Sequence, residues 1–238
     1  MIRTIAFDCM ETLIDMDLLP GKDDYFLWGL EGSGLERLSG LDREGLLMAY
    51  REAALALEAE FQGLREYPLR ARYARVAEKV LPGLDRRGIL AMAAEMEERF
   101  MGIYGSHCYV SGEKRKALEA LAKELPLHVL SNFKVEGGIA RLLERCGVGE
   151  LFAGIHTSME AGWRKPHPRT YAYLAERTGF AYGETLFVGD DRECDYLAPR
   201  ALGMQALWYR QGVRTKGPEE IGSFLEIGER LGRGGTGQ

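Results

Sequence analysis

The hydrophobic and polar positions of this chain follow two different periods. Short strand-like runs, each ending in polar residues, recur at 4–7, 127–130, 154–158, 185–188 and 205–209. Such runs are typical of buried strands in a parallel sheet. Apolar residues at helical spacing occupy the intervals at 113–123, 139–146, 170–178 and 195–202, and a last helix is expected over 219–230. Strands that alternate with helices predict an α/β fold with a mostly parallel sheet.

Residues 16–103 differ from the rest of the chain. Their apolar positions recur only at helical spacing, for example at Leu46, Tyr50 and Leu57, and no strand is evident. This pattern predicts a small helical bundle inserted after the first strand. The expected organisation is a core made of 1–15 and 104–231, a helical insert over 16–103, and a glycine-rich flexible tail over 232–238.

Composition limits the classes of partner. Hydrophobic residues make up 46% of the 238 residues, which is enough for a packed core. The formal net charge of -5 argues against nucleic acid as a partner, and no apolar run approaches the length of a membrane span.

The sequence enters its first strand without a leader segment, so we expect a cytoplasmic protein. The four cysteines lack the close spacing of a zinc site. Nothing in the sequence indicates the oligomeric state.

Polar side chains follow four of the expected strands. They are Asp8, the pair Ser131-Asn132, Lys165 and the pair Asp190-Asp191. Because the carboxyl ends of parallel strands share one edge of a sheet, these groups should meet there. Asp8 and Asp190 could hold one Mg²⁺, while a lysine and a serine hydroxyl bind phosphate oxygens. Asp8 could then attack phosphorus and form an aspartyl-phosphate that water hydrolyses. A strand-end Asp that only caps the next turn is the structural alternative.

The same residues carry a family resemblance that covers nearly the whole chain. Four segments resemble, in order, the motifs of the haloacid dehalogenase-like (HAD) hydrolase superfamily: Phe7-Asp8-x-x-x-Thr12-Leu13, Leu130-Ser131-Asn132, Arg164-Lys165-Pro166-x-Pro168 and Val188-Gly189-Asp190-Asp191-x-x-x-Asp195. The resemblance implies subfamily I: a Rossmann-like three-layer α/β/α core with an inserted α-helical cap of type 1. It also implies an enzyme; most members are phosphatases that act on small phosphorylated molecules, and a minority displace halide from haloacids.

The resemblance also implies roles for single residues. Asp8 takes the place of the nucleophile and Lys165 that of the charge-balancing lysine. Ser131, with Thr12 and Asn132, takes the place of the substrate-binding residues. Asp190 takes the place of a Mg²⁺ ligand, alongside Asp8 and the backbone carbonyl of Met10. Asp191, next to it, is also expected among the metal ligands, with Asp195 near or just behind it.

One position departs from the phosphatase pattern. Phosphatases of this family carry a second Asp two residues after the nucleophile, as general acid and base, and here that residue is Met10. Its side chain cannot carry a proton, and such a group typically contributes ~10²–10⁴-fold to the rate. Glu11 stands where the family usually has Gly, and one hypothesis is that Glu11 substitutes as the acid/base. The alternative is that Glu11 only begins a turn or helix.

Three functions therefore stay open. The first is a Mg²⁺-dependent phosphatase, suited to substrates with a good leaving group. The second is a metal-independent 2-haloacid dehalogenase, which needs no second Asp. The position of Tyr171 also resembles that of a tyrosine found in dehalogenases. Against this function stand the acidic pair Asp190-Asp191 and the absence of an arginine from Ile14 to Glu36; we interpret Tyr171 as a helix residue that packs on the sheet. The third is a degenerate family member that binds a phosphorylated ligand without turnover.

Overall fold

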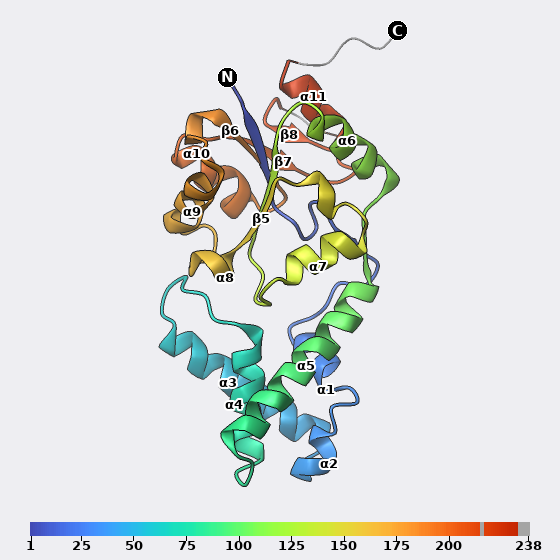
Figure 1. Ribbon diagram of the computed structural model, residues 1–238, viewed down its shortest axis with the longest axis vertical. Helices are drawn as coiled ribbons and strands as arrows, with labels where there is room; N and C mark the ends of the chain where they lie inside the picture. Colours follow the sequence, from blue (N-terminus) through green and yellow to red (C-terminus); the bar gives the residue numbers. More distant parts are fainter. Residues whose placement is uncertain (215–216, 233–238) are drawn as a thin grey trace. The chain divides into compact units, whose positions relative to one another are not determined.

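The computed structural model describes residues 1–214 and 217–232, and these divide into two compact units. The first unit comprises Met1–Asp15, Tyr109–Phe133 and Ile139–Gln238 (Figure 1). The second comprises Met16–Cys108 and Lys134–Gly138. The flexible tail expected over 232–238 lies outside the described residues, apart from Gly232.

A six-stranded sheet forms the centre of the first unit, in the order β5-β4-β1-β6-β7-β8. Its strands are β1 (Thr4–Phe7), β4 (Leu127–Ser131), β5 (Gly154–Thr157), β6 (Thr185–Gly189), β7 (Gln205–Tyr209) and β8 (Glu220–Ile221). Every pairing is parallel. The three central strands β4, β1 and β6 are buried along their whole length, which explains why they are apolar runs without alternation. The predicted α/β fold with a parallel sheet is confirmed.

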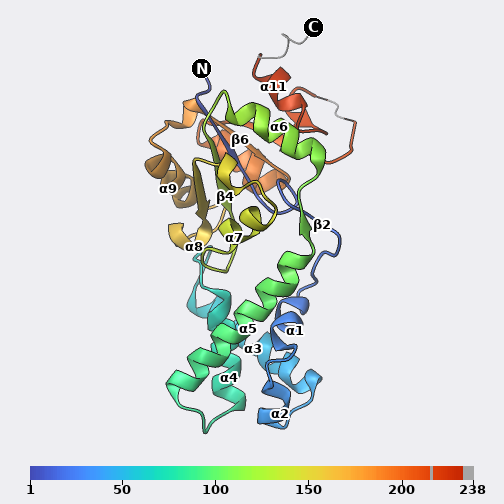
Figure 2. The ribbon, with the colours of Figure 1, turned by 45° about the vertical axis from the view of Figure 1, so that its right-hand side comes forward.

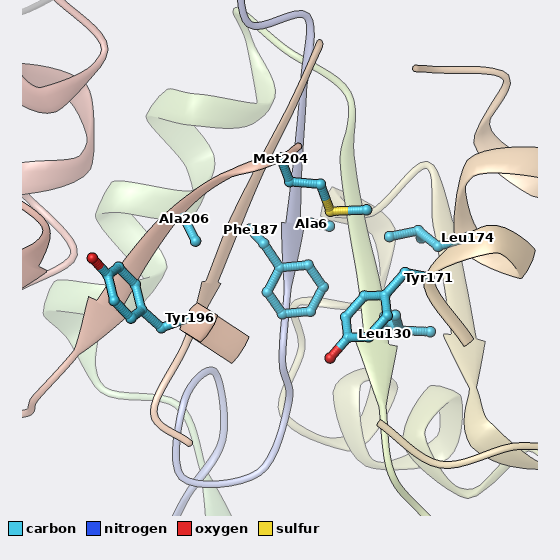
Figure 3. Packing of buried hydrophobic residues seen from close by; sticks show 8 residues of the cluster. All are labelled: Ala6, Leu130, Tyr171, Leu174, Phe187, Tyr196, Met204 and Ala206. Carbon is cyan, nitrogen blue, oxygen red and sulfur yellow. The ribbon is translucent and has the colours of Figure 1, made fainter. Parts of the chain in front are cut away.

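Helices cover both faces of this sheet. On one face, α9 (Pro168–Thr178), the π-helix η3 (Arg192–Leu197) and α10 (Ala198–Ala201) enclose a cluster of buried side chains. Figure 3 shows this cluster, in which Tyr171 lies beside Phe187. The other face carries α6 (Gly112–Ala122), α7 (Gly138–Arg145) and α11 (Glu226–Arg230) (Figures 1 and 2). Phe7 of the central strand stacks there on Phe224 and meets Phe152 edge-on.

The second unit is helical. Its helices are α1 (Asp24–Leu30), α2 (Leu35–Ser39), α3 (Arg43–Glu60), α4 (Leu69–Val80) and α5 (Arg86–Ser106) (Figure 2). Asp42 and Asp85 cap α3 and α5 by accepting hydrogen bonds from backbone N–H groups of their first turns. The helix α5 continues beyond residue 103, and residues 134–138 pack with this unit because the Leu69 N–H donates to the Lys134 carbonyl. The short strands β2 (Asp15–Met16) and β3 (Cys108–Tyr109) pair with each other.

The prediction of one helix over 219–230 is wrong. Glu220 and Ile221 instead form β8, which pairs with Trp208 and Tyr209 at the edge of the sheet. Gly222 then lets the chain pass so close to the Val213 carbonyl that a Cβ atom would meet it at 2.3 Å. Only the last turns, α11, are helical. A two-residue strand is too short to leave a period in the sequence.

Two other elements differ in detail. The helix expected over 195–202 begins earlier, at Arg192, because the Asp191 carboxylate accepts hydrogen bonds from the N–H groups of Glu193 and Cys194. The strand run expected over 154–158 ends one residue earlier, because Ser158 begins the short helix α8 (Ser158–Ala161), which a Thr157–Glu160 capping box stabilises. Among the described residues, no helix combines the length and the apolar character that a membrane span requires.

Candidate active site

Asp8 lies directly after β1, at the carboxyl edge of the central sheet. Its N–H donates to the carbonyl of Val188 on the neighbouring strand at 2.9 Å, so the backbone is held by the sheet. The side chain is largely buried, and its Oδ1 accepts a hydrogen bond from the Lys165 ammonium at 2.7 Å. Its other oxygen, Oδ2, has no hydrogen-bond partner among the described residues. One oxygen of a fixed carboxylate is therefore free to react or to bind a cation.

Lys165 stands between two carboxylates. Its Nζ lies 2.7 Å from Asp8 Oδ1 and 2.7 Å from Asp195 Oδ1, and the side chain is 2% exposed. Burial alone would lower the pKa of Lys165, but the charges of Asp195 and Asp8 and their hydrogen bonds raise it above its ordinary value. Lys165 therefore carries a fixed positive charge at the edge of the sheet where Asp8, Asp190 and Asp195 lie, which we call the acidic edge. This charge neutralises part of the negative charge of the three carboxylates.

Asn132 fixes the backbone of this lysine. Its Oδ1 accepts a hydrogen bond from the Lys165 N–H at 2.8 Å, and its Nδ2 donates to the Lys165 carbonyl at 2.9 Å. The sequence suggested that Asn132 binds substrate. That role stays a prediction; in the structure both ends of the Asn132 amide are engaged with Lys165, and Asn132 thereby positions the lysine.

Three carboxylates gather around this lysine. One oxygen from each of Asp8, Asp190 and Asp195 lies within 4.8 Å of the other two. Burial, and next the charge of Asp8, raise the pKa of Asp190 to about 6, although a hydrogen bond from Thr12 opposes the shift. Burial also raises the pKa of Asp195, with Lys165 opposing it. The cluster thus holds more negative charge than one lysine balances, which favours binding of a cation.

Thr12 belongs to this acidic edge and is buried. Its hydroxyl donates to Asp190 Oδ1 at 2.8 Å and accepts from the Asp190 N–H at 3.1 Å. The substrate-binding role suggested for Thr12 by the sequence stays a prediction; in the structure both hydrogen bonds of its hydroxyl are made to Asp190. We therefore assign it to the orientation of Asp190.

Ser131 ends β4, one strand away from Asp8. Its side chain is buried, and its hydroxyl oxygen has no hydrogen-bond partner within the described part of the chain. An unpartnered buried hydroxyl costs free energy unless another group satisfies it. Ser131 is therefore the predicted substrate-binding residue whose side chain is still available to a ligand.

Met10 and Glu11 lie in the turn that follows Asp8. Met10 makes an isolated parallel bridge with Ile14. Glu11 has φ 58°, and no other non-glycine residue in the described chain has a positive φ. This conformation explains why the family pattern has Gly there. The Glu11 side chain is exposed, and its charge contributes to the raised pKa of Asp190, so it lies close enough to influence the acidic edge.

Asp191 was expected among the metal ligands, but it lies outside the three-carboxylate group. Its Oδ1 caps the π-helix η3, and its N–H donates to Asp195 Oδ2 at 3.1 Å. Asp195 joins the group instead, because η3 brings it back toward Lys165. Asp195 is part of the fourth family motif. Its spacing from Asp191 along a helix of unknown type could not show which of these two carboxylates points toward Lys165.

Tyr171, which resembles a dehalogenase residue, belongs to the core. It is fully buried among Leu130, Phe187 and Leu174, and its hydroxyl donates to the Cys194 carbonyl (Figure 3). The interpretation of Tyr171 as a helix residue that packs on the sheet is confirmed.

Comparison with known proteins identifies the family. The sequence model of the haloacid dehalogenase-like hydrolases matches residues 2–203. This chain is a haloacid dehalogenase-like hydrolase. The predicted family membership is thereby confirmed, and with it the general class of enzyme, a hydrolase.

Relatives of this hydrolase include phosphatases. Phosphoserine phosphatase of Thermus thermophilus is 28% identical over 193 residues, 77% of this chain and 72% of that enzyme. Phosphoglycolate phosphatase of Escherichia coli K12 is 35% identical over 91 residues, 38% of this chain and 35% of that enzyme. Human haloacid dehalogenase-like hydrolase domain-containing protein 3 is 34% identical over 99 residues, 41% of this chain and 38% of that protein. The matched stretch thus spans less than two fifths of the human and E. coli proteins.

Solved structures share the fold. A 2-haloacid dehalogenase of Pseudomonas syringae superimposes with a TM-score of 0.73 at 23% identity, over 98% of this chain and 99% of that one. A HAD phosphatase of Thermococcus onnurineus gives a TM-score of 0.63 at 18% identity, over 97% of this chain and 98% of that one. Because a dehalogenase and a phosphatase share this fold, the fold does not choose between the two reactions.

Proposed function

We propose that this hydrolase removes a phosphoryl group from a small phosphorylated molecule, in a Mg²⁺-dependent reaction in which Asp8 is the nucleophile. One observation carries the proposal: three carboxylates from separate elements meet around a buried lysine, and one of them keeps a free oxygen. A reaction without a metal would leave this excess of negative charge uncompensated where an anionic substrate must bind.

The donor set fits Mg²⁺. Carboxylate and carbonyl oxygens are its preferred ligands, and Asp8 and Asp190 would hold it, together with the backbone carbonyl of Met10. Burial, and next the charge of Asp8, raise the pKa of Asp190, as expected of a carboxyl group that shares a site with a second acid. When bound, the ion supplies positive charge that offsets the charge of the phosphoryl group.

Ser131, Lys165 and Asp8 have separate roles in the proposed reaction. Ser131 donates its unpartnered hydroxyl to a phosphoryl oxygen, and Lys165 supplies positive charge beside Asp8. A carboxylate oxygen of Asp8 forms a bond to phosphorus while the bond to the leaving group breaks, and the leaving group keeps the electron pair. Water then attacks phosphorus of the aspartyl-phosphate, the bond from phosphorus to Asp8 breaks with its electron pair going to the regenerated carboxylate, and the oxygen and both protons of the water leave with the phosphate as dihydrogen phosphate.

Met10 narrows the class of substrate. Because Met10 cannot protonate a leaving group, an alkoxide would depart slowly, whereas a carboxylate or a phosphate departs without a proton. We therefore favour an acyl phosphate or a phosphoanhydride. Glu11 is exposed beside the acidic edge. If Glu11 acts as the general acid/base, the range of substrates would extend to phosphate esters.

Met10 is also compatible with a second candidate function, the metal-independent 2-haloacid dehalogenase, because a halide ion likewise leaves without a proton. Opposing it, Asp190 retains the acidic character of a metal site, and Tyr171 is committed to the core. A degenerate member that binds ligand without turnover is the third candidate.

One set of assays separates the three. Acetyl phosphate and p-nitrophenyl phosphate are tested with Mg²⁺ and with EDTA, for the wild type and for Asp8→Asn. We expect phosphate release from acetyl phosphate that EDTA and Asp8→Asn both abolish. Chloride release from 2-chloropropionate that EDTA leaves unchanged would establish the dehalogenase. Thermal stabilisation by acetyl phosphate without turnover would establish the degenerate member.

A further inference from the structure

A second buried ion pair lies in the same unit as the acidic edge but outside the three-carboxylate group. Lys114, near the start of α6, is 1% exposed, and Asp15, at the start of β2, is 5% exposed. The Lys114 Nζ lies 2.6 Å from Asp15 Oδ1. Two aromatic rings enclose the ammonium, with their centroids 5.1 Å away for Tyr209 and 5.6 Å away for Phe224. The proposed reaction uses neither charge.

Within the described ranges of the chain, the Asp15 carboxylate has Lys114 as its one hydrogen-bond partner. Its second oxygen, Oδ2, is buried and has no hydrogen-bond partner among the described residues. Burial most strongly lowers the pKa of Lys114, and the charges of Asp15 and Asp190 oppose that shift. Lys114 and Asp15 thus form a buried ion pair in which each is the neighbouring counter-charge of the other. Removal of either partner leaves an unpaired buried charge.

The turn over 9–14 lies between Asp15 and the residue that contacts Asp190. The turn that precedes Asp15 is closed by hydrogen bonds from the Leu13 and Ile14 N–H groups to the Cys9 carbonyl, at 2.8 and 2.9 Å. The same turn carries Thr12, whose hydroxyl holds Asp190. One end of the turn is thus fixed to the sheet at Asp8, and the other end is fixed to Lys114 through Asp15.

We propose that Lys114 is a positioning residue of the active site: by anchoring Asp15, it holds the turn over 9–14 in the form in which Thr12 orients Asp190 toward Asp8. The part of this inference that concerns Mg²⁺ rests on the proposed function, because it takes Asp190 as a metal ligand. The part that concerns the turn does not.

Amide exchange tests the anchor without any substrate. Hydrogen exchange of the Leu13 and Ile14 N–H groups is followed by NMR in the wild type and in Lys114→Met. Since a buried single charge can prevent folding, the double variant Asp15→Asn/Lys114→Met, which removes both charges, is measured as well. We expect exchange about tenfold faster or more at both amides in the folded variants, because the turn opens locally once its second anchor is lost.

Mg²⁺ binding, measured by calorimetry on the same proteins, tests the consequence for Asp190. We expect about tenfold weaker binding in both Lys114 variants, as the loss of one oriented ligand implies. Arg70→Met is the matched control, because Arg70 also pairs with a buried carboxylate, Glu97, but in the helical unit. It should lower stability while leaving the Leu13 and Ile14 amides and the Mg²⁺ affinity unchanged.

The outcomes separate this inference from the proposed function. Unchanged exchange at Leu13 and Ile14 in a folded Lys114 variant would overturn the positioning role, whatever the metal does. Faster exchange with unchanged Mg²⁺ affinity would overturn the link to Asp190. Faster exchange in a protein whose wild type binds no Mg²⁺ would support the anchor and refute the metal-dependent function.

Discussion

Replacement of Thr12 by Val should shift the pH dependence of Mg²⁺ binding. In the proposed site Mg²⁺ would bind the ionised form of Asp190, so protons would compete with the metal below the pKa of that carboxyl group. The Thr12 hydroxyl donates to Asp190 Oδ1 at 2.8 Å and stabilises the ionised form. Valine has almost the same shape but no hydroxyl, so the substitution removes this stabilisation and should raise the pKa of Asp190 above its present value of about 6.

The size of the shift follows from the hydrogen bond. A hydrogen bond to a charged group contributes about 1.5–3 kcal/mol, and one pKa unit corresponds to about 1.4 kcal/mol, so the pKa should rise by about 1–2 units. At pH 7 about nine tenths of wild-type Asp190 is ionised, whereas about a tenth to a half would be ionised in the variant. The apparent Mg²⁺ affinity at pH 7 should therefore fall about 2–10-fold, and the difference should shrink as the pH rises to 9.

Calorimetric Mg²⁺ titrations between pH 5 and pH 9 test this expectation. Thr4→Val is the matched control, because Thr4 is a buried threonine whose hydroxyl bonds to the Pro126 carbonyl instead of a carboxylate. Its pH midpoint should equal that of the wild type. If Thr12→Val leaves both the midpoint and the affinity of the wild type, the assignment of Thr12 to Asp190 is wrong; a uniform loss of affinity at every pH would show that the hydroxyl orients Asp190 without stabilising its ionised form, and would refute the predicted pKa shift.

Three further variants test other parts of the site and fold. Glu11→Gly should raise the free energy of unfolding in urea by about 1 kcal/mol, because it relieves the strain of a positive φ; a fall in turnover of ~10²–10⁴-fold would instead show that Glu11 carries the proton. Asn132→Ala should lower kcat for acetyl phosphate about tenfold or more by releasing the backbone of Lys165, with an unchanged kcat refuting that role. Burial lowers the pKa of His128 to about 4 in the folded protein, below the 6.5 of the unfolded chain. Its neutral form therefore contributes fully to stability above pH 6.5, and up to about 3 kcal/mol is lost as the pH falls through 4. His128→Leu should flatten this part of the urea stability profile, and an unchanged slope would contradict it.

The sequence predicted the parts of the site that follow from sheet geometry. Asp8, Lys165 and Asp190 come after separate strands or the loops that follow them, and parallel strands bring such positions to one edge whatever the loops do. The distances from Lys165 to Asp8 and among the carboxylates agree with that rule.

The roles that depend on loop conformation could not be predicted. Thr12 and Asn132 stand at motif positions, but whether a hydroxyl or an amide faces a ligand or a neighbouring residue depends on hydrogen bonds across 178 and 33 positions. The Lys114–Asp15 pair was missed for the same reason, because a charged residue near a helix start is usually solvated. The packing of residues 134–138 with the helical unit left no sequence signal either.

The claim on which the whole account depends is that Asp8 accepts the phosphoryl group. Its most direct test is mass spectrometry of peptides from enzyme quenched in acid during turnover of acetyl phosphate with Mg²⁺. We expect the mass of one phosphoryl group on Asp8, which disappears when the reaction is quenched after the substrate is exhausted. A phosphoryl group found on a different residue would contradict the account.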